Sequence, residues 1–458
     1  MGRVESRPGA RVGWVEQARE GAYRGTVVIH TLGCKLNQAD SDVLARRFVE
    51  SGYRVVDSVA QADVFVLNTC TVTAAADAKA RQILRAARRA NPKAYIVATG
   101  CYAQRAAAEL THLGAVSLVA GNSQKDRLVS MVMQGHERKE SPAPCPPAPV
   151  ALGTSHGSSR VETTGRTRAM IKIQEGCNQV CAYCIVPKVR GRERSIPPEV
   201  LVRQIDQQAT EGFQEVVLTG TQLGTYGFDI PGVNLVGLLR RVLAETRVPR
   251  LRVSSLQPQE ISPVLLELWG DRRLCPHFHV PLQSGSDRVL RAMRRRYDTA
   301  RFASTVELIR RTVPEASITT DLIVGFPGEG DAEFQASRDF ARSMRFSDMH
   351  IFPFSPRPGT SAAYFGDRVS APAKKERAAE MQMVAALGFQ AFRNQQLGQV
   401  RPVLWEHPRV RSGITVCNGL TDNYVRVYTD GDADLGNNIT PARLVALVDD
   451  WVYVRQLG

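Results

Sequence analysis

The sequence predicts an α/β protein with three folded parts: a parallel α/β domain, a larger partial barrel of βα units, and a small C-terminal β-barrel. Short β-rich runs alternate with amphipathic helical patterns in residues 25–135 and again in residues 167–396. Such alternation is typical of parallel sheets covered by helices. Residues 397–458 instead contain short strands separated by Gly, Asn and Asp, which is typical of a small antiparallel barrel.

Length and composition agree with several soluble domains. A chain of 458 residues is too long for one core, and its 43% hydrophobic and 23% charged residues are ordinary for a globular protein. No run of apolar residues is long enough to span a membrane, and residues 1–24 lack the apolar core of a signal peptide, so we expect a loose extension there. The nine cysteines, clustered and odd in number, favour metal binding in a reducing compartment over disulfides.

The net charge of +14 points to a polyanionic partner such as RNA. Residues 21–135 carry 14 basic and 8 acidic side chains, and residues 168–397 carry 31 and 24. Residues 398–458 carry 6 and 7, so the excess lies in the first two parts. A basic protein without any such partner is the plainer alternative.

In residues 25–135, three cysteines each follow a predicted strand directly. Cys34 follows the run 26–31, Cys70 follows 63–68 and Cys101 follows 94–98, with helices expected at about 37–51 and 74–90. In a parallel sheet the strand C-termini share one edge, so three residues far apart in sequence would converge there. Three unrelated buried cysteines are the alternative, since free cysteine is often part of a core.

A segment rich in proline, serine and glycine follows, at residues 136–166, and predicts an extended linker. Cys145 lies inside its proline run, and we interpret it as incidental.

Six predicted strands in residues 167–396 indicate a partial (β/α)6 barrel. Helical patterns separate them, and a basic segment after the first strand, residues 187–194, reads as extended. The strands are expected at 169–174, 215–219, 250–254, 277–280, 318–324 and 350–354, and the helices at 198–212, 235–245, 258–269, 287–296, 300–312, 332–344 and 371–396. In βα barrels the chemistry sits at the C-terminal ends of the strands.

Three cysteines lie within eight residues just after the first of these strands. Cys177, Cys181 and Cys184 are spaced CxxxCxxC, and no further Cys or His is nearby to complete a closed zinc site. Three thiolates on a short loop suit three corners of a cubane iron–sulfur cluster whose fourth iron stays open. A zinc knuckle or three buried thiols are the alternatives. We interpret Cys275 and Cys417 as buried thiols, Cys275 close to the barrel mouth.

The CxxxCxxC loop resembles the signature of the radical S-adenosylmethionine (SAM) enzymes, in which the open iron chelates SAM. The strings around the other three cysteines, Thr-Leu-Gly-Cys34-Lys-Leu-Asn-Gln, Asn-Thr-Cys70-Thr-Val-Thr and Ala-Thr-Gly-Cys101-Tyr-Ala-Gln, resemble the N-terminal domain of the methylthiotransferases. That resemblance implies a flavodoxin-like N-terminal domain with an auxiliary cluster on Cys34, Cys70 and Cys101, a TIM-type radical SAM barrel, and a C-terminal TRAM module. The strings look most like the branch that acts on threonylcarbamoyladenosine in tRNA.

The same resemblance implies where SAM is bound. SAM is expected beside strand ends, at Thr219, Gly220, Ser254 and Gly325. The spacing of basic residues suggests an RNA-binding surface in three places. These are a helix face with Arg81, Arg85 and Arg88, an extended edge after the cysteine loop, and a basic residue of the last module. The expected RNA-binding residues are Arg81, Arg85, Arg88, Lys188, Arg190, Arg192 and Arg426. Solvated charge and ion pairs within the protein are the plainer explanations of these runs.

The function implied is a tRNA methylthiotransferase that uses two [4Fe-4S] clusters and SAM to convert N6-threonylcarbamoyladenosine beside the anticodon to its 2-methylthio form. The expected partners are a tRNA anticodon stem-loop and an electron donor such as flavodoxin or ferredoxin, for a cytoplasmic monomer with no membrane contact. The alternatives are the same chemistry on isopentenyladenosine or on an aspartate of a ribosomal protein, a non-catalytic iron–sulfur RNA-binding redox sensor, and a zinc-stabilised structural protein.

Overall fold

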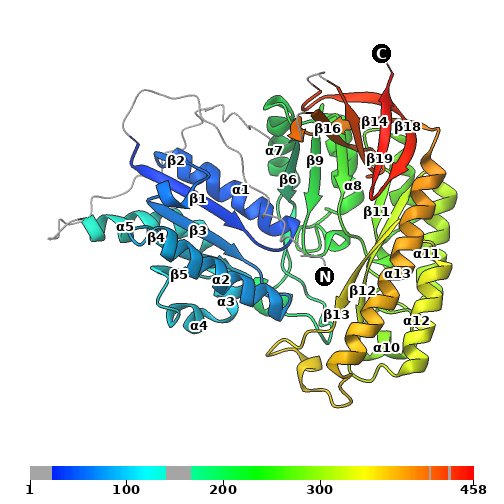
Figure 1. Ribbon diagram of the computed structural model, residues 1–458, viewed down its shortest axis with the longest axis horizontal. Helices are drawn as coiled ribbons and strands as arrows, with labels where there is room; N and C mark the ends of the chain where they lie inside the picture. The colour runs from blue at the N-terminus through cyan, green and yellow to red at the C-terminus, as the bar shows by residue number, and fades with distance from the viewer. Residues whose placement is uncertain (1–22, 141–166, 412–413, 432–434, 458) are drawn as a thin grey trace. The chain divides into compact units, whose positions relative to one another are not determined.

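The computed structural model describes residues 23–140, 167–411, 414–431 and 435–457 (Figure 1). The chain divides into two compact units, with the boundary between Gly165 and Arg166. Cys145, most of the predicted linker and nearly all of the predicted N-terminal extension lie outside the described residues. Within the described ranges, no helix has the length and apolar character needed to cross a membrane.

The first unit is a five-stranded parallel sheet with helices on both faces. Its strand order is β2-β1-β3-β4-β5, the flavodoxin-like order, which confirms the predicted fold. The strands are β1 (Gly25–Thr31), β2 (Tyr53–Val55), β3 (Val64–Thr69), β4 (Tyr95–Gly100) and β5 (Leu118–Ala120). The helices are α1 (Lys35–Glu50), α2 (Ala74–Ala90), α3 (Cys101–Arg105), α4 (Ala107–Thr111) and α5 (Leu128–Glu140).

Two separate apolar cores hold these helices to the sheet. Leu44 and Phe48 of α1 pack with Leu128 of α5 on one face. On the other face, Leu84 of α2 packs with Tyr102 of α3. The central strand β3 is buried along its whole length, as expected for a strand covered on both sides. Strand β5 and helix α5 were not predicted, and α5 continues past the expected domain boundary at residue 135.

The second unit contains the predicted barrel of six parallel strands. These are β6 (Arg168–Lys172), β9 (Glu215–Thr219), β10 (Arg250–Val253), β11 (His277–His279), β12 (Ser317–Val324) and β13 (Asp348–Pro353). They form two runs, β6-β9-β10 and β11-β12-β13, which parallel bridges join between Leu251 and Leu274 and between Ser255 and His279. The surrounding helices are α7 (Pro198–Thr210), α8 (Leu235–Glu245), α9 (Pro263–Leu266), α10 (Asp287–Ala292), α11 (Thr299–Thr312), α12 (Asp331–Ser343) and α13 (Ala371–Gln396).

Two expectations in this barrel are wrong for local reasons. The helix expected over residues 258–269 is broken into a 3-10 turn (Pro258–Glu260), α9 and a second turn (Glu267–Gly270). Pro263 disfavours helix at the preceding residue, and Ser262 caps a new start by accepting a hydrogen bond from the Leu265 amide. The segment expected to be extended after the cysteine loop begins as a short helix, α6 (Val186–Arg190), which ends at Gly191 with φ of +77°.

The last part of the chain is a small closed barrel. Its strands β14 (Val400–Trp405), β18 (Ile439–Val448), β19 (Trp451–Gln456), β17 (Arg426–Asp430) and β16 (Ile414–Thr421) pair in that order, and β16 pairs back to β14. A sixth strand, β15 (Arg409–Arg411), pairs antiparallel with β16. Trp405 fills the core and is fully buried. Strand β18 was not predicted, because Pro441 within it argues against a strand from sequence.

The small barrel lies at the N-terminal ends of the large barrel's strands (Figure 1), and buried polar contacts fix it there. Arg250, the first residue of β10, forms an ion pair of 2.9 Å with Glu215, the first residue of β9, and donates hydrogen bonds to the Leu420 and Thr421 carbonyls. The Tyr424 hydroxyl donates to the same Glu215 carboxylate. The ends of the strands where chemistry is expected therefore face the opposite way.

Candidate cofactor sites

The loop that carries Cys177, Cys181 and Cys184 leaves the C-terminal end of β6 and is held by backbone hydrogen bonds. The Cys177 amide donates to the Gly191 carbonyl at 3.1 Å, and the Ala182 amide donates to the Met293 carbonyl at 3.0 Å. Gly176 precedes the loop with φ of +81°, and a Cβ there would collide with the Arg192 carbonyl. Glycine is therefore required to start this loop.

The three thiols of this loop lie close enough to influence one another. Burial raises the pKa of Cys177 to about 11, and the nearby Cys181 adds to that effect. Burial raises the pKa of Cys184 to about 12, again with contributions from Cys181 and Cys177. Neutral, crowded thiols of this kind are costly to ionise without a cation, and a metal cluster deprotonates its ligands on binding. The donor set therefore fits a metal cluster.

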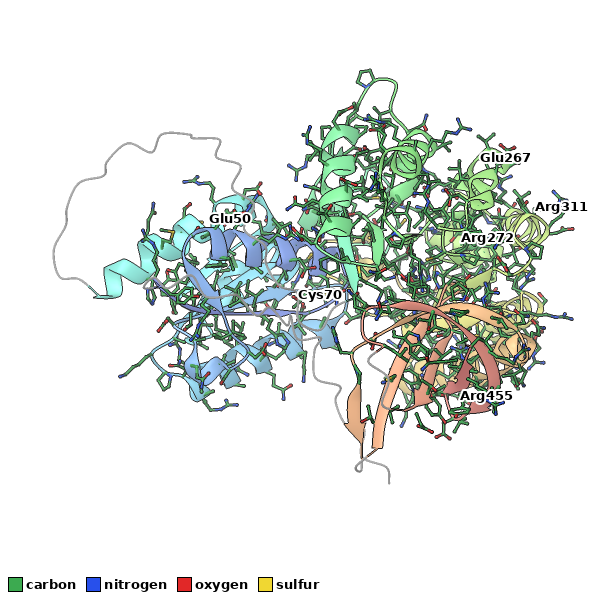
Figure 2. The ribbon with its side chains drawn as sticks, turned by 90° about the horizontal axis from the view of Figure 1, so that it is seen from above. Glu50, Cys70, Glu267, Arg272, Arg311 and Arg455 are labelled. Atoms are coloured by element: carbon green, nitrogen blue, oxygen red, sulfur yellow. The ribbon has the colours of Figure 1, made fainter. Side chains whose placement is uncertain are left out.

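The second triad sits at one edge of the parallel sheet of the first unit, as predicted. Cys34 caps the N-terminus of α1 after β1, Cys70 follows β3, and Cys101 begins α3 after β4. Strands β1, β3 and β4 are neighbours, so the three residues lie side by side at the strand ends; Figure 2 labels Cys70 there. Gly33 has φ of +100°, and a Cβ on it would lie 2.6 Å from the Cys70 Cβ.

The pKa of Cys70 also indicates that the three thiols of this edge lie close together. Burial raises the pKa of Cys70 to about 12, with further contributions from Cys34 and Cys101. Two N–H groups point at the sulfurs: the Val72 amide lies 3.5 Å from the Cys70 Sγ, and the Asn122 Nδ2 lies 3.6 Å from the Cys101 Sγ. Such donors stabilise thiolate ligands of a cluster.

Neither triad has the geometry of a single-ion site. In the part of the chain that the structure describes, no three or more His, Cys, Asp or Glu side chains are placed to hold one metal ion. Thiolates that hold an iron–sulfur cluster bind different irons and need not meet at one point.

Two asparagines from the recognisable strings brace the second triad. Asn37 donates to the Leu32 carbonyl at 2.7 Å and to the Thr69 carbonyl at 3.1 Å, and Asn68 donates to the Asn37 carbonyl at 2.9 Å. Both asparagines are buried, so these hydrogen bonds tie the loop after β1 to the end of β3. The strings around the cysteines thus encode the supports of the site.

The residues expected to contact SAM all lie at the same end of the barrel as the cysteine loop. Thr219 ends β9, and an added Cβ on the following Gly220 would lie 3.0 Å from the Gln174 carbonyl. Ser254 follows β10, and Gly325 follows β12 with φ of +73°. Their contact with SAM stays a prediction.

Sequence reasoning missed a buried polar network at this end of the barrel. The Gln174 Oε1 accepts from the backbone amides of Thr221 and Gln222, and the Gln257 Nε2 donates to the Gln179 Oε1 at 3.1 Å. Gln222 also donates to Glu260. Burial raises the pKa of Glu260 to about 6. Scattered glutamines carry no motif, so only their convergence in space reveals them.

The candidate RNA residues separate into exposed and internally bonded groups. On the expected face of α2, Arg88 is bonded within the protein, because it donates to the carbonyls of Pro92, Ala94 and Ala115. Arg81 donates to the Tyr102 hydroxyl at 2.7 Å, whereas Arg85 is exposed.

After the cysteine loop, Arg190 is likewise unavailable to RNA, since it is buried and forms an ion pair of 2.7 Å with Glu175. Lys188 and Arg192 are exposed. In the last module Arg426 is exposed, with its guanidinium 5.8 Å from the centre of the Trp451 ring. Exposed Arg85, Lys188, Arg192 and Arg426 therefore remain as candidates.

Buried Cys275 is not near the barrel mouth, contrary to expectation. It precedes β11 and lies by Arg250 at the opposite end of the barrel, and burial raises its pKa to about 12. Cys417 is buried in the core of the small barrel.

Comparisons with known proteins agree with this arrangement. Residues 26–121 match the uncharacterized protein family UPF0004, and residues 171–341 match the radical SAM superfamily. The chain is 38% identical to the threonylcarbamoyladenosine tRNA methylthiotransferase MtaB of Aquifex aeolicus, over 90% of this chain and 98% of that protein. It is 36% identical to the Bacillus subtilis protein of the same name, over 92% and 94% of the two chains.

A tRNA-2-methylthio-N(6)-dimethylallyladenosine synthase of Syntrophobacter fumaroxidans is 34% identical over 91% of this chain and 92% of that protein. Among solved structures, the radical SAM methyltransferase TsrM of Kitasatospora setae superimposes with a TM-score of 0.52 at 17% identity, over 74% of this chain and 77% of that one, which supports the fold. With both domain matches and full-length relatives of this kind, the chain belongs to the family of radical SAM methylthiotransferases.

Proposed function

We propose that this enzyme acts on tRNA and converts N6-threonylcarbamoyladenosine beside the anticodon to its 2-methylthio derivative. Two observations support the proposal. The first relatives named above act, by name, on that nucleoside, and they match this chain over 98% and 94% of their own length. The six cysteines form two triads, each at strand ends.

The position to be modified explains why the cofactors matter. Adenine C2 carries an inert C–H bond, and no acid, base or thiolate side chain functionalises such a carbon at neutral pH. When bound, a cluster at Cys177, Cys181 and Cys184 supplies the electron that cleaves SAM, and one at Cys34, Cys70 and Cys101 supplies the sulfur. Two [4Fe-4S] clusters are therefore part of the proposal, as is a donor of the flavodoxin or ferredoxin type.

The protein's own residues bind, orient and shield these groups. The six thiols provide the ligands, and Asn37 and Asn68 fix the loops that carry one triad. Thr219, Gly220, Ser254 and Gly325 surround the place proposed for SAM at the strand ends. The target base must leave its stack to reach the chemistry, as in other enzymes that modify bases. Exposed Lys188 and Arg192, next to the cysteine loop, are suited to the RNA backbone.

Nucleoside mass spectrometry tests the proposal. Bulk tRNA from a strain lacking the gene should contain threonylcarbamoyladenosine without its 2-methylthio form, and the wild-type gene should restore that form whereas C177A should not. A monomeric protein acting in the cytoplasm is expected to suffice for complementation.

The dimethylallyladenosine branch is the second candidate, because a member of it is 34% identical over 91% of this chain. Restoration of 2-methylthio-isopentenyladenosine instead would establish that substrate. Loss of the methylthio group from an aspartate of a ribosomal protein in the deletion strain would establish that protein as the substrate. No change in any of these, with no 5′-deoxyadenosine formed from SAM and dithionite, would favour a non-catalytic redox sensor.

A further inference from the structure

One partly buried arginine, Arg295, contacts the cysteine loop, and the site described above gives it no role. The Arg295 Nη1 lies 3.2 Å from the Cys181 Sγ, its Nη2 donates to the Gln257 Oε1 at 3.0 Å, and its Nε donates to the Tyr297 hydroxyl at 3.1 Å. Its guanidinium also lies 4.8 Å from the centre of the Tyr297 ring. All three kinds of N–H of this side chain are therefore engaged on one side of the loop.

The backbone at the end of α10 explains why this arginine turns inward. Arg294 has φ of +59°, its amide donates to the Arg291 carbonyl, and the Arg295 amide donates to the Leu290 carbonyl, both at 2.9 Å. This pair of hydrogen bonds is a Schellman motif, which ends a helix with one left-handed residue. The same turn holds the cysteine loop, since the Met293 carbonyl accepts from the Ala182 amide.

Three consecutive arginines, Arg294, Arg295 and Arg296, stand at this turn, and the structure distinguishes the middle one. Arg294 and Arg296 are exposed, whereas Arg295 is only partly accessible and is bonded as described. Arg296 is therefore a control of the same residue type, one position away in the sequence.

Cys181 is the one hydrogen-bond partner of Arg295 that is also a proposed cluster ligand; the other two are Gln257 and Tyr297. A cluster deprotonates its cysteine ligands, and a guanidinium N–H directed at a thiolate sulfur forms a charge-assisted hydrogen bond. The geometry thus anticipates a negatively charged sulfur at Cys181.

We propose that Arg295 is a positioning residue for the radical SAM cluster: it donates an N–H to the Cys181 thiolate and places a fixed positive charge beside the cluster. Hydrogen bonds to cluster sulfurs and nearby positive charge favour the reduced form, which carries one more negative charge. Arg295 therefore makes the cluster easier to reduce. The inference rests on a cluster at Cys177, Cys181 and Cys184, and it is independent of the RNA substrate.

The test is a potentiometric titration of this cluster followed by electron paramagnetic resonance. A C34A/C70A/C101A background leaves only the cluster of interest. In this background R295Q should decrease the ratio of reduced to oxidised cluster at a fixed potential at least tenfold, a shift of about 59 mV for one electron. R296Q should leave the ratio unchanged, because Arg296 is exposed. R295K keeps the charge but loses the forked donor set, so its ratio should lie between those of R295Q and the parent protein.

Two results would overturn the inference. One is equal potentials for R295Q and R296Q. The other is an unchanged potential with a raised Kd for SAM in R295Q, which would assign Arg295 to the SAM carboxylate instead. If R295Q does not retain iron, the titration of R295K tests the inference instead. A cluster potential in R295K equal to that of the parent protein would refute the role. A parent protein that binds no iron at this loop would instead refute the cluster itself.

Discussion

Removing Arg250 should destabilise the second unit strongly, because it takes the ion-pair partner away from the buried carboxylate of Glu215. The Arg250 side chain is 4% exposed and that of Glu215 is fully buried, with 2.9 Å between the Nη2 and Oε2 atoms. The contact is an ion pair more than an aligned hydrogen bond, since no hydrogen-bond partner satisfies the Oε2 atom. In R250A the Glu215 carboxylate keeps the hydrogen bond from the Tyr424 hydroxyl and an electrostatic interaction with Arg168, but it loses its ion-pair partner.

The expected loss follows from the burial of both groups. Breaking one side of a buried ion pair costs about 3–5 kcal/mol of unfolding free energy. Arg250 also supplies hydrogen bonds to the Leu420 and Thr421 carbonyls, so the loss should lie toward the upper end of that range. Because these carbonyls belong to the small barrel, its attachment to the large barrel should weaken as well.

Urea unfolding followed by tryptophan emission measures this loss, since Trp405 is fully buried in the small barrel. R241A is the matched control: Arg241 pairs with Glu199 and Glu245 in solvent, and its removal should leave the midpoint unchanged. A double variant, R250M/E215L, removes both charges and should recover most of the lost stability. The reasoning would be refuted if R250A unfolded at the same urea concentration as R241A, or if the double variant were less stable than R250A.

Further predictions follow from single sites. G33A should lose more than about 2 kcal/mol of unfolding free energy, because the left-handed backbone alone costs about 1–2 kcal/mol and the new Cβ would also collide with Cys70. G114A is the control: Gly114 has φ of +67° and open space around it, so this variant should lose only the free energy of the backbone strain. Burial raises the pKa of Glu260 from 4.5 to about 6, so the folded state binds the proton more tightly than the unfolded state does. As pH falls from 7 to 4, the unfolding free energy of the wild type, measured by urea titration, should therefore gain about 2 kcal/mol on that of E260Q, and equal pH profiles would contradict this. Cys275 should resist iodoacetamide in the native protein, because burial raises its pKa to about 12, and mass spectrometry of native-labelled peptides would reveal any modification.

The sequence allowed the fold and the ligands to be predicted where a local signal was present. Each cysteine of the first triad directly follows a buried strand, so topology alone places Cys34, Cys70 and Cys101 at one edge. Strand β18 was not predicted, because Pro441 lies within it and proline disfavours strands. The helix expected near residues 258–270 is broken because of the single proline at position 263.

Side-chain roles that depend on tertiary contacts were not predictable in the same way. Helical spacing placed Arg88 on a charged face, but its guanidinium binds carbonyls from the segments after α2 and before β5. Sequence spacing placed Arg190 on an exposed edge, but its side chain is buried and forms an ion pair with Glu175. Arg295 carried no signal beyond a run of three arginines, because only the turn after α10 decides which one faces the cysteine loop.

The claim that two thiol triads each hold a four-iron cluster is tested most directly by the iron content of anaerobically purified protein. The wild type should contain about eight irons per chain, and C34A/C70A/C101A and C177A/C181A/C184A should contain about four each. About one zinc and no iron in the wild type, or an undiminished eight irons in either triple variant, would contradict the account.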